Sequence, residues 1–253
     1  EQQLQEAMFV RLASEYERKY RLEVRRSMTK IGRAVLKSPS ELSKEVQAHG
    51  ERLAKILRGN YEAAFDIFGS RILDAASKDF NRHLERKFDV PRTDMFDSAQ
   101  IAWIKENVAL KITEISSTTQ EQVLAIVREV QRQAVVDGLG EAATAKLIRE
   151  RISEAGGSLA AYRSRAIART ESHAAANAAN YEAAKATGII AKKEWVSSAG
   201  ERTRSAHRSA DGQRVGIDES FTVGGEQLRY PGDPNGSAAN VINCRCVAMN
   251  IVD

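Results

Sequence analysis

Apolar residues recur at helical spacing through roughly the first 160 positions of the chain. Between Glu1 and Leu36 they follow four-residue steps, at Met8, Leu12, Tyr16, Tyr20 and Val24. Residues at this spacing share one face of an α-helix. The pattern predicts one long, heavily charged amphipathic helix that stops at Pro39.

A second helical stretch is expected from Ser40 and Ser43 onward. Its apolar positions form two successive sets, Val46, Leu53, Ile56 and Leu57, then Tyr61, Ala64, Phe65, Phe68, Ile72 and Leu73. Asp89-Val90-Pro91 predicts its end, because the residue before a proline disfavours helical backbone.

The next stretch divides into three predicted helices. The first carries the amphipathic series Ile101, Ile104, Val108, Ile112 and Ile115. Ser116 to Thr119 interrupts that series, and Thr118 with Glu121 predicts a capping box that opens a new helix. Gly138 and Gly140 are expected to close the second helix. A short third one, with Leu147, Ile148 and Ile152, is expected to end at Gly156-Gly157.

The pattern changes from helix to strand near Gly188. An Ala-rich helix from Ser158 ends there, and Lys192 to Ser198 reads as a strand around Trp195. Two short β-prone runs flank Gly224-Gly225, which predicts a hairpin, and the segment 241–252 is β-prone as well. We therefore expect an α+β protein with a helical arm over 1–99. A compact module of an Ala-rich helix and a small antiparallel β-sheet would follow over 100–253.

Composition agrees with a largely helical protein. Aromatic residues make up 6% of the chain and charged residues 28%, with a formal charge of +4 and a pI of about 9.1. This mild basicity supports nucleic-acid contact only weakly. The segment Glu1 to Leu4 lacks the features of a signal peptide, and no apolar run approaches the roughly 20 residues of a membrane span. We expect no membrane association, and synthesis in a reducing compartment, because two cysteines one residue apart cannot form a disulfide framework.

One polar stripe runs along the Ala-rich helix. Arg169, His173, Asn177 and Asn180 follow at steps of four, four and three, while the many alanines leave a surface that another element can approach closely. The stripe is either a ligand or metal face, or a buried hydrogen-bonded seam against the β-module. The residue types favour the seam, since arginine and asparagine supply many donors.

His207, Cys244 and Cys246 are the candidate zinc ligands. Zinc prefers four nitrogen or sulfur ligands, and the fourth would be Asp211, His173 or water. The alternative is that both cysteines are small apolar residues on one face of a final strand. Cys244, His207 and Asp211 also have the residue types of a catalytic triad. Neither a Gly-x-Ser-x-Gly elbow nor a phosphate-binding loop is present, so no catalytic residue is assigned.

Basic residues follow helical spacing in the first predicted helix. The central basic residues of this run are Arg25, Arg26, Lys30 and Arg33. They are the candidate contacts for DNA phosphates or for an acidic wall of a partner. The alternative is a solvated helix face, since Glu15, Glu17 and Glu23 dilute the charge.

The order and spacing of motifs after Leu159 resemble the head-morphogenesis or minor head protein family of tailed phages, often called Mu F-like. The match runs to Val252. The motif residues are Arg169, Thr170, Glu171, Trp195, Arg202, Arg204, His207, Asp211, Gly212, Phe221, Leu228, Pro231, Gly232, Asp233, Asn243, Cys244 and Cys246. The sequence departs from the family where Gly200 replaces an expected aspartate.

The resemblance implies a structural virion protein in the capsid interior, near the portal vertex, that passes through the host cytoplasm during assembly. It implies the portal protein as partner, with packaged DNA and major capsid or scaffold proteins as further contacts. The expected role is head morphogenesis, and the resemblance extends this role to DNA packaging or ejection. The alternative is a toxin-like or nucleic-acid-processing enzyme module carried in the virion. No cofactor is implied by the resemblance, and zinc rests on the three candidate ligands.

Overall fold

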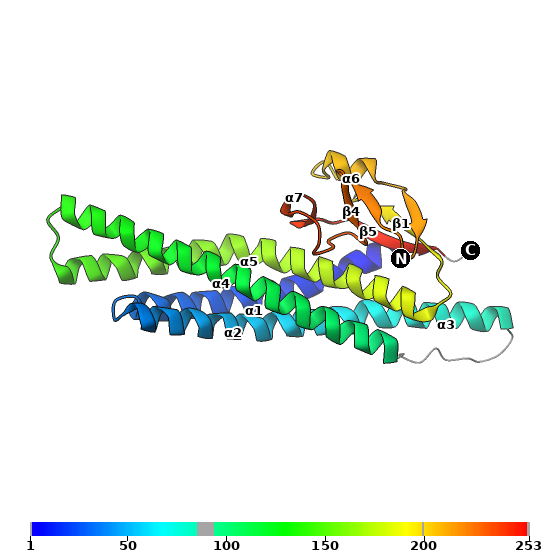
Figure 1. Cartoon of the computed structure of the whole chain (residues 1–253), viewed down its shortest axis with the longest axis horizontal. Helices are drawn as coiled ribbons and strands as arrows, with labels where there is room; N and C mark the ends of the chain where they lie inside the picture. Colours follow the sequence, from blue (N-terminus) through cyan, green and yellow to red (C-terminus); the bar gives the residue numbers. More distant parts are fainter. Residues whose placement is uncertain (1, 85–93, 199, 252–253) are drawn as a thin grey trace. The chain divides into compact units, whose positions relative to one another are not determined.

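The computed structural model describes the backbone of residues 2–84, 94–198 and 200–251 (Figure 1). Side chains are described there too, except those of 2–6, 39, 79–84 and 158–163. The expected break at Asp89-Val90-Pro91 lies outside these ranges. The fold is α+β, as the sequence predicts, with long helices followed by short antiparallel strands.

The helices and strands have the following bounds. The helical part comprises α1 Gln2–Ala34, α2 Pro39–Ala64, the π-helix η1 Phe65–Gly69, α3 Ser70–Leu84, α4 Asp94–Val136 and α5 Glu141–Thr187. The remainder comprises β1 Lys192–Val196, α6 Ser205–Ser209, β2 Arg214–Gly216, β3 Phe221–Val223, β4 Glu226–Leu228, α7 Ala238–Val241 and β5 Val247–Ile251.

The chain forms two compact units, each built from separate stretches of sequence. Unit 1 comprises residues 1–14, 59–105 and 166–253, and unit 2 comprises 15–58 and 106–165. The unit limits fall inside α1, α2, α4 and α5. The boundaries between these compact units do not fall at residue 100. The separation into a partner-facing arm over 1–99 and a module over 100–253 stays a prediction about function.

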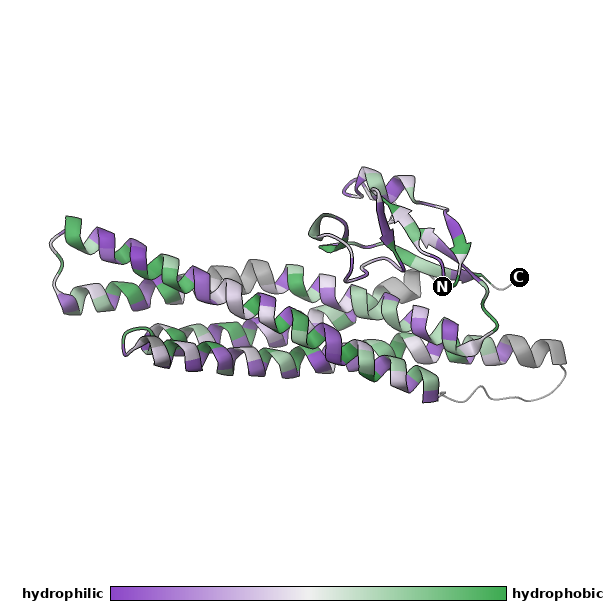
Figure 2. Ribbon diagram, in the orientation of Figure 1, coloured by the Kyte–Doolittle hydropathy of each residue, from purple (hydrophilic) through white to green (hydrophobic). Residues whose placement is uncertain are grey.

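Unit 2 is held together by apolar helix faces and close helix contacts. Tyr16, Tyr20, Val24, Leu53 and Leu57 are buried, as their spacing predicts. Figure 2 shows hydrophilic and hydrophobic residues alternating along the long helices, as expected of amphipathic helices.

The predicted break between Ser116 and Thr119 is wrong, because α4 runs through it without interruption. The hydroxyl groups bond inside the helix instead: Thr118 donates to the carbonyl of Glu114 at 2.8 Å and Thr119 to that of Ile115 at 2.7 Å. Such bonds to the carbonyl four residues back let threonine sit in a helix interior. Thr118 is therefore not an N-cap.

The predicted helix end at Gly156-Gly157 is also wrong, since α5 continues from Glu141 to Thr187. A Cβ atom on Gly156 would lie 2.7 Å from Cβ of Met28 in α1. Glycine is needed here for the close approach of two helices, not for a turn. Gly138 does end α4 as predicted, with a φ of +66°.

In unit 1 an aromatic cluster joins the end of α2, η1 and the start of α4. The rings of Tyr61 and Trp103 meet edge to face at 4.8 Å, and Phe65 lies 5.5 Å from Trp103. Ile101, which the periodicity places on the buried face, is 67% exposed. The apolar face of α4 is set here by Phe96, Trp103 and Ile104, which are buried.

The sheet of unit 1 has the strand order β2-β1-β5, and both pairings are antiparallel. Trp195, at its centre, is fully buried and meets Phe221 edge to face at 5.4 Å. The predicted hairpin is confirmed, because β3 pairs with β4 across Gly224 and Gly225, which both have positive φ. Only part of the β-prone C-terminal segment is strand, since α7 ends at Val241 and residues 242–246 form a turn and loop before β5.

The Ala-rich half of α5 provides the close approach that its composition predicts. Eight of its alanines are buried: Ala168, Ala174, Ala175, Ala176, Ala178, Ala179, Ala183 and Ala184. A Cβ atom on Gly232 would lie 3.2 Å from the Cα of Ala174, so the turn after Tyr230 rests directly on the helix backbone. Among the described helices, none combines the length and the apolar character that a membrane span requires.

Candidate functional site

The polar stripe of α5 forms a seam with the last strand. Nε2 of His173 donates to the carbonyl of Cys246 at 2.5 Å. Asn177 donates from Nδ2 to the same carbonyl and accepts the backbone N–H of Ala248 at 3.1 Å. These bonds confirm the seam for His173 and Asn177. Burial lowers the pKa of His173, which favours the neutral ring.

The second cluster joins His207 of α6 to both cysteines. Nδ1 of His207 lies 3.3 Å from Sγ of Cys246 and 3.7 Å from Sγ of Cys244. Both cysteines are free and buried, and the ring of His207 packs edge to face on Trp195 at 5.6 Å. The three candidate zinc ligands are therefore brought together.

The pKa values of the two thiols in this cluster are shifted in opposite directions. A hydrogen bond from Cys244 lowers the pKa of Cys246, and His207 acts in the same direction. The same bond, together with burial, raises the pKa of Cys244. The geometry thus favours a thiolate on Cys246 that accepts from the Cys244 thiol.

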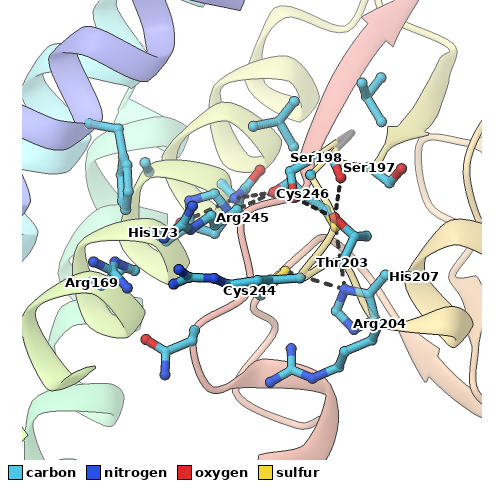
Figure 3. Close-up of a pocket in the computed structure, with 18 of the residues that line it drawn as sticks. Arg169, His173, Ser197, Ser198, Thr203, Arg204, His207, Cys244, Arg245 and Cys246 are labelled. Carbon is cyan, nitrogen blue, oxygen red and sulfur yellow. Dashed lines mark hydrogen bonds between the residues drawn. The ribbon is translucent and has the colours of Figure 1, made fainter.

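Both clusters line one cavity of about 710 Å³ within unit 1 (Figure 3). Four arginines line it: Arg169, Arg202, Arg204 and Arg245. Among the described lining residues none is acidic. Arg204 donates to the carbonyl of Ile242, which fixes its guanidinium at the wall. The cavity is therefore suited to an anionic group.

Other motif residues tie separate elements together. Thr170 accepts the backbone N–H of Asn243 at 3.0 Å, next to the Cys-Arg-Cys motif. Asn243 itself has a φ of +56°, a conformation that asparagine tolerates better than most residues. Glu171 accepts the hydroxyl of Tyr61 at 2.6 Å, which joins α5 to α2 inside unit 1.

Turns near the sheet account for the motif acids and glycines. Asp211 accepts the backbone N–H of Ser197 at 2.7 Å, and Gly212, with a φ of +75°, donates to the carbonyl of Trp195 at 2.8 Å. Asp233, after Pro231 and Gly232, is 1% exposed and pairs with Arg229 at 2.9 Å. These residues fix loops against the core.

The catalytic-triad combination is not assembled. Asp211 is engaged at Ser197, and Nε2 of His207 has no hydrogen-bond partner among the described residues. An orienting acid would have to accept from that nitrogen while Nδ1 faces the cysteines. Cys244, His207 and Asp211 therefore do not form a nucleophile, base and orienter.

The basic residues of α1 lie in unit 2, apart from this site in sequence. Arg25, Arg26, Lys30 and Arg33 are all exposed. The glutamates expected to dilute them are paired elsewhere, since Glu15 bonds Lys19, Glu17 lies 3.7 Å from Arg165, and Glu23 bonds Arg52. We call Arg25, Arg26, Lys30 and Arg33 the cationic stripe.

Several residues around the site are not predicted by the sequence pattern. Phe9 meets His173 edge to face at 4.8 Å, and Phe68 also lines the cavity. Asn60 accepts the hydroxyl of Ser172 at 3.0 Å. Tyr61 was placed on an apolar face, but nothing in its spacing signals the hydroxyl bond to Glu171. Distant partners of this kind leave no local pattern.

The C-terminal half of the chain matches a known family. Residues 125–249 match the family model described as Phage Mu protein F like protein. The minor head protein GP7 of Bacillus phage SPP1 is 29% identical over 124 residues, which cover 48% of this chain and 38% of that protein. No solved structure matches the chain.

Two bacterial proteins are similar over shorter stretches. The NAD(+)--arginine ADP-ribosyltransferase EFV of Enterococcus faecalis is 38% identical over 90 residues, which are 34% of this chain and 18% of that protein. The uncharacterized protein YqbB of Bacillus subtilis is 37% identical over 95 residues, which are 36% of this chain and 31% of that protein. The chain thus matches well under half the length of each relative.

Proposed function

We propose, from the match of residues 125–249 to the family model described as Phage Mu protein F like protein, that this chain is a structural minor head protein of a tailed phage. It lies inside the capsid, binds the portal protein and acts in head morphogenesis, with a part in DNA packaging or ejection. The observation that carries the proposal is this family match together with the similarity to an SPP1 minor head protein. The structure supports it, since the motif residues described above hold elements together.

We assign no enzymatic activity to the chain. The similarity to the ADP-ribosyltransferase covers 18% of that protein, so its activity is not carried over to this chain. The alternative of a toxin-like or nucleic-acid-processing module would need a reactive group with a positioned partner. His207 and Cys246 come closest to such a pair. Asp211 does not orient His207, because it bonds to the backbone of Ser197.

Cross-linking mass spectrometry on intact particles tests the portal contact. We expect lysine-reactive cross-links between the portal protein and the helical arm 1–99, which carries the exposed lysines Lys19, Lys30, Lys37, Lys44, Lys55 and Lys78. Lys192, exposed on β1, serves as an internal comparison outside the arm. Absence of the chain from particles would overturn the virion role, and portal cross-links from Lys192 alone would overturn docking through the arm.

Charge reversal tests whether the cationic stripe contacts DNA. The triple variant Arg25→Glu, Arg26→Glu, Lys30→Glu is expected to weaken DNA binding and to flatten its salt dependence. Each lost phosphate contact lowers the slope of log K against log [salt] by about 0.9. A reduction of roughly 2–3 is therefore expected. Binding is measured by fluorescence anisotropy across a salt series.

A matched control separates the stripe from overall charge. The variant Arg128→Glu, Arg132→Glu, Lys146→Glu changes the net charge equally at exposed positions of α4 and α5. We expect its salt slope to stay close to that of the unmodified protein. Equal slopes for both triple variants would show that the stripe has no specific role in binding DNA.

A further inference from the structure

Three metal-binding donors converge inside unit 1. The Nδ1 atom of His207 and the Sγ atoms of Cys244 and Cys246 lie within 4.8 Å of one another. They come from two segments of the chain, α6 and the stretch before β5, and each side chain is at most 2% exposed. The fold therefore holds one imidazole and two thiols around a common point.

The two nitrogen–sulfur separations in this cluster fit the edges of a tetrahedral zinc site. Zinc binds thiolate sulfur at about 2.3 Å and imidazole nitrogen at about 2.0–2.1 Å. At a tetrahedral angle, sulfur and nitrogen on one ion then lie about 3.6 Å apart. The Nδ1–Sγ distances of 3.3 and 3.7 Å fall on either side of that value. One ion could therefore contact the imidazole and either sulfur with small side-chain movements.

We propose that His207, Cys244 and Cys246 bind one Zn²⁺ ion, whose fourth position takes a water molecule or a small anion from the cavity. Two thiolates and a neutral imidazole balance the charge of the ion, so the buried cluster becomes neutral. Because zinc binds cysteine as the thiolate, binding releases thiol protons to solvent. Thiolate and imidazole ligands select zinc over magnesium or calcium, which prefer oxygen.

The surroundings explain why the fourth ligand comes from the cavity. Asp211 is held by the backbone of Ser197, and His173 by the carbonyl of Cys246. All three donors line the arginine-rich cavity, which gives a water molecule or an anion access to the ion. The proposal does not depend on the virion role, because it rests on these side chains alone.

Elemental analysis of the full chain, produced with zinc in the medium, gives the first test. We expect one zinc ion per chain. Cys244→Ser and Cys246→Ser should lower zinc affinity by more than the roughly 10–100-fold that follows loss of a residue that merely orients a ligand. The matched controls are His173→Gln and Asp211→Asn, which should keep one ion. Loss of zinc in either control, with the fold intact by circular dichroism, would overturn the ligand set.

A cobalt titration of the unmodified chain tests the metal site even if a cysteine variant fails to fold. The unmodified chain is stripped of metal, reduced and titrated with Co²⁺. We expect a thiolate-to-cobalt charge-transfer band and the intense visible bands of tetrahedral cobalt, saturating at one equivalent and displaced by Zn²⁺. A folded, reduced chain without these bands would overturn the proposal and leave a hydrogen-bonded thiol and imidazole cluster. The same conclusion would follow if the native chain carried a Cys244–Cys246 disulfide.

Discussion

Replacing Asp233 by alanine is expected to lower the free energy of unfolding of unit 1 by about 2–3 kcal/mol. The carboxylate is 1% exposed and accepts from the backbone, Nε and Nη2 of Arg229 at 2.9, 2.9 and 3.1 Å. It also accepts from the backbone and side chain of Asn235 at 3.2 and 3.1 Å. Truncation leaves these donors, one of them charged, without their acceptor.

The measurement is urea unfolding followed by tryptophan fluorescence. Both tryptophans, Trp103 and Trp195, lie in unit 1, so the signal reports on the unit that contains Asp233. The control is Asp218→Ala, which removes an exposed ion pair with Lys185. Exposed pairs contribute roughly 0–1 kcal/mol, so this variant should unfold almost like the original protein. Similar losses for both variants would contradict the argument.

Acidification should reduce the difference between the protein and its Asp233→Ala variant. Burial alone raises the pKa of Asp233, but the hydrogen bonds from Arg229 outweigh it, and the net pKa is lowered. A carboxylate with a lowered pKa in the folded state stabilises the protein above its unfolded-state value. That contribution is lost as pH falls through the folded-state pKa.

Lys193 should make the protein more stable as pH rises from 7 to 10. Its side chain is 1% exposed, and Nζ donates to the carbonyl of Ile217 at 2.8 Å and lies 4.5 Å from the ring centre of Tyr181. Burial lowers the pKa of Lys193 from 10.5 to about 8. The folded state therefore binds fewer protons than the unfolded state between these values, and charging this group opposes folding at lower pH.

The comparison with Lys193→Met isolates this effect from other titrating groups. From pH 7 to pH 10 the original protein should gain roughly 2 kcal/mol relative to the variant, as the proton leaves the folded protein. Unfolding free energies from urea titrations at several pH values give the difference. A difference that stays constant with pH would show that Lys193 titrates near its ordinary pKa.

Local patterns carried most of the helical prediction, and the errors have physical causes. Thr118 and Thr119 resemble a helix start because hydroxyl residues favour caps, yet their side chains bond to carbonyls of the same helix. Gly156 resembles a helix end, but its role is set by Met28, more than a hundred positions away. A local sequence pattern shows the type of a residue. It does not show the distant neighbour that determines the structural role of that residue.

The sequence predicted which residues belong to the candidate site, but not how they are arranged in space. Spacing placed His173 and Asn177 on one helix face, and motif order singled out His207 and the cysteines. The carbonyl of Cys246 accepts hydrogen bonds from both of these side chains. These bonds could not be predicted, because they depend on how β5 lies along α5. The short strand β2 was missed as well, since three residues of the type Arg-Val-Gly give no periodic signal.

The interleaving of the two units has a consequence for vectorial synthesis on the ribosome. All of unit 2 has been translated by residue 165, whereas unit 1 combines residues 1–14 and 59–105 with 166–253. Unit 1, which contains the apolar residues Tyr61, Phe65 and Trp103, can therefore fold only after the last third of the chain has been translated. Nascent chains that pause after residue 165 would expose this surface, and they would be the natural clients of a chaperone during production of the protein.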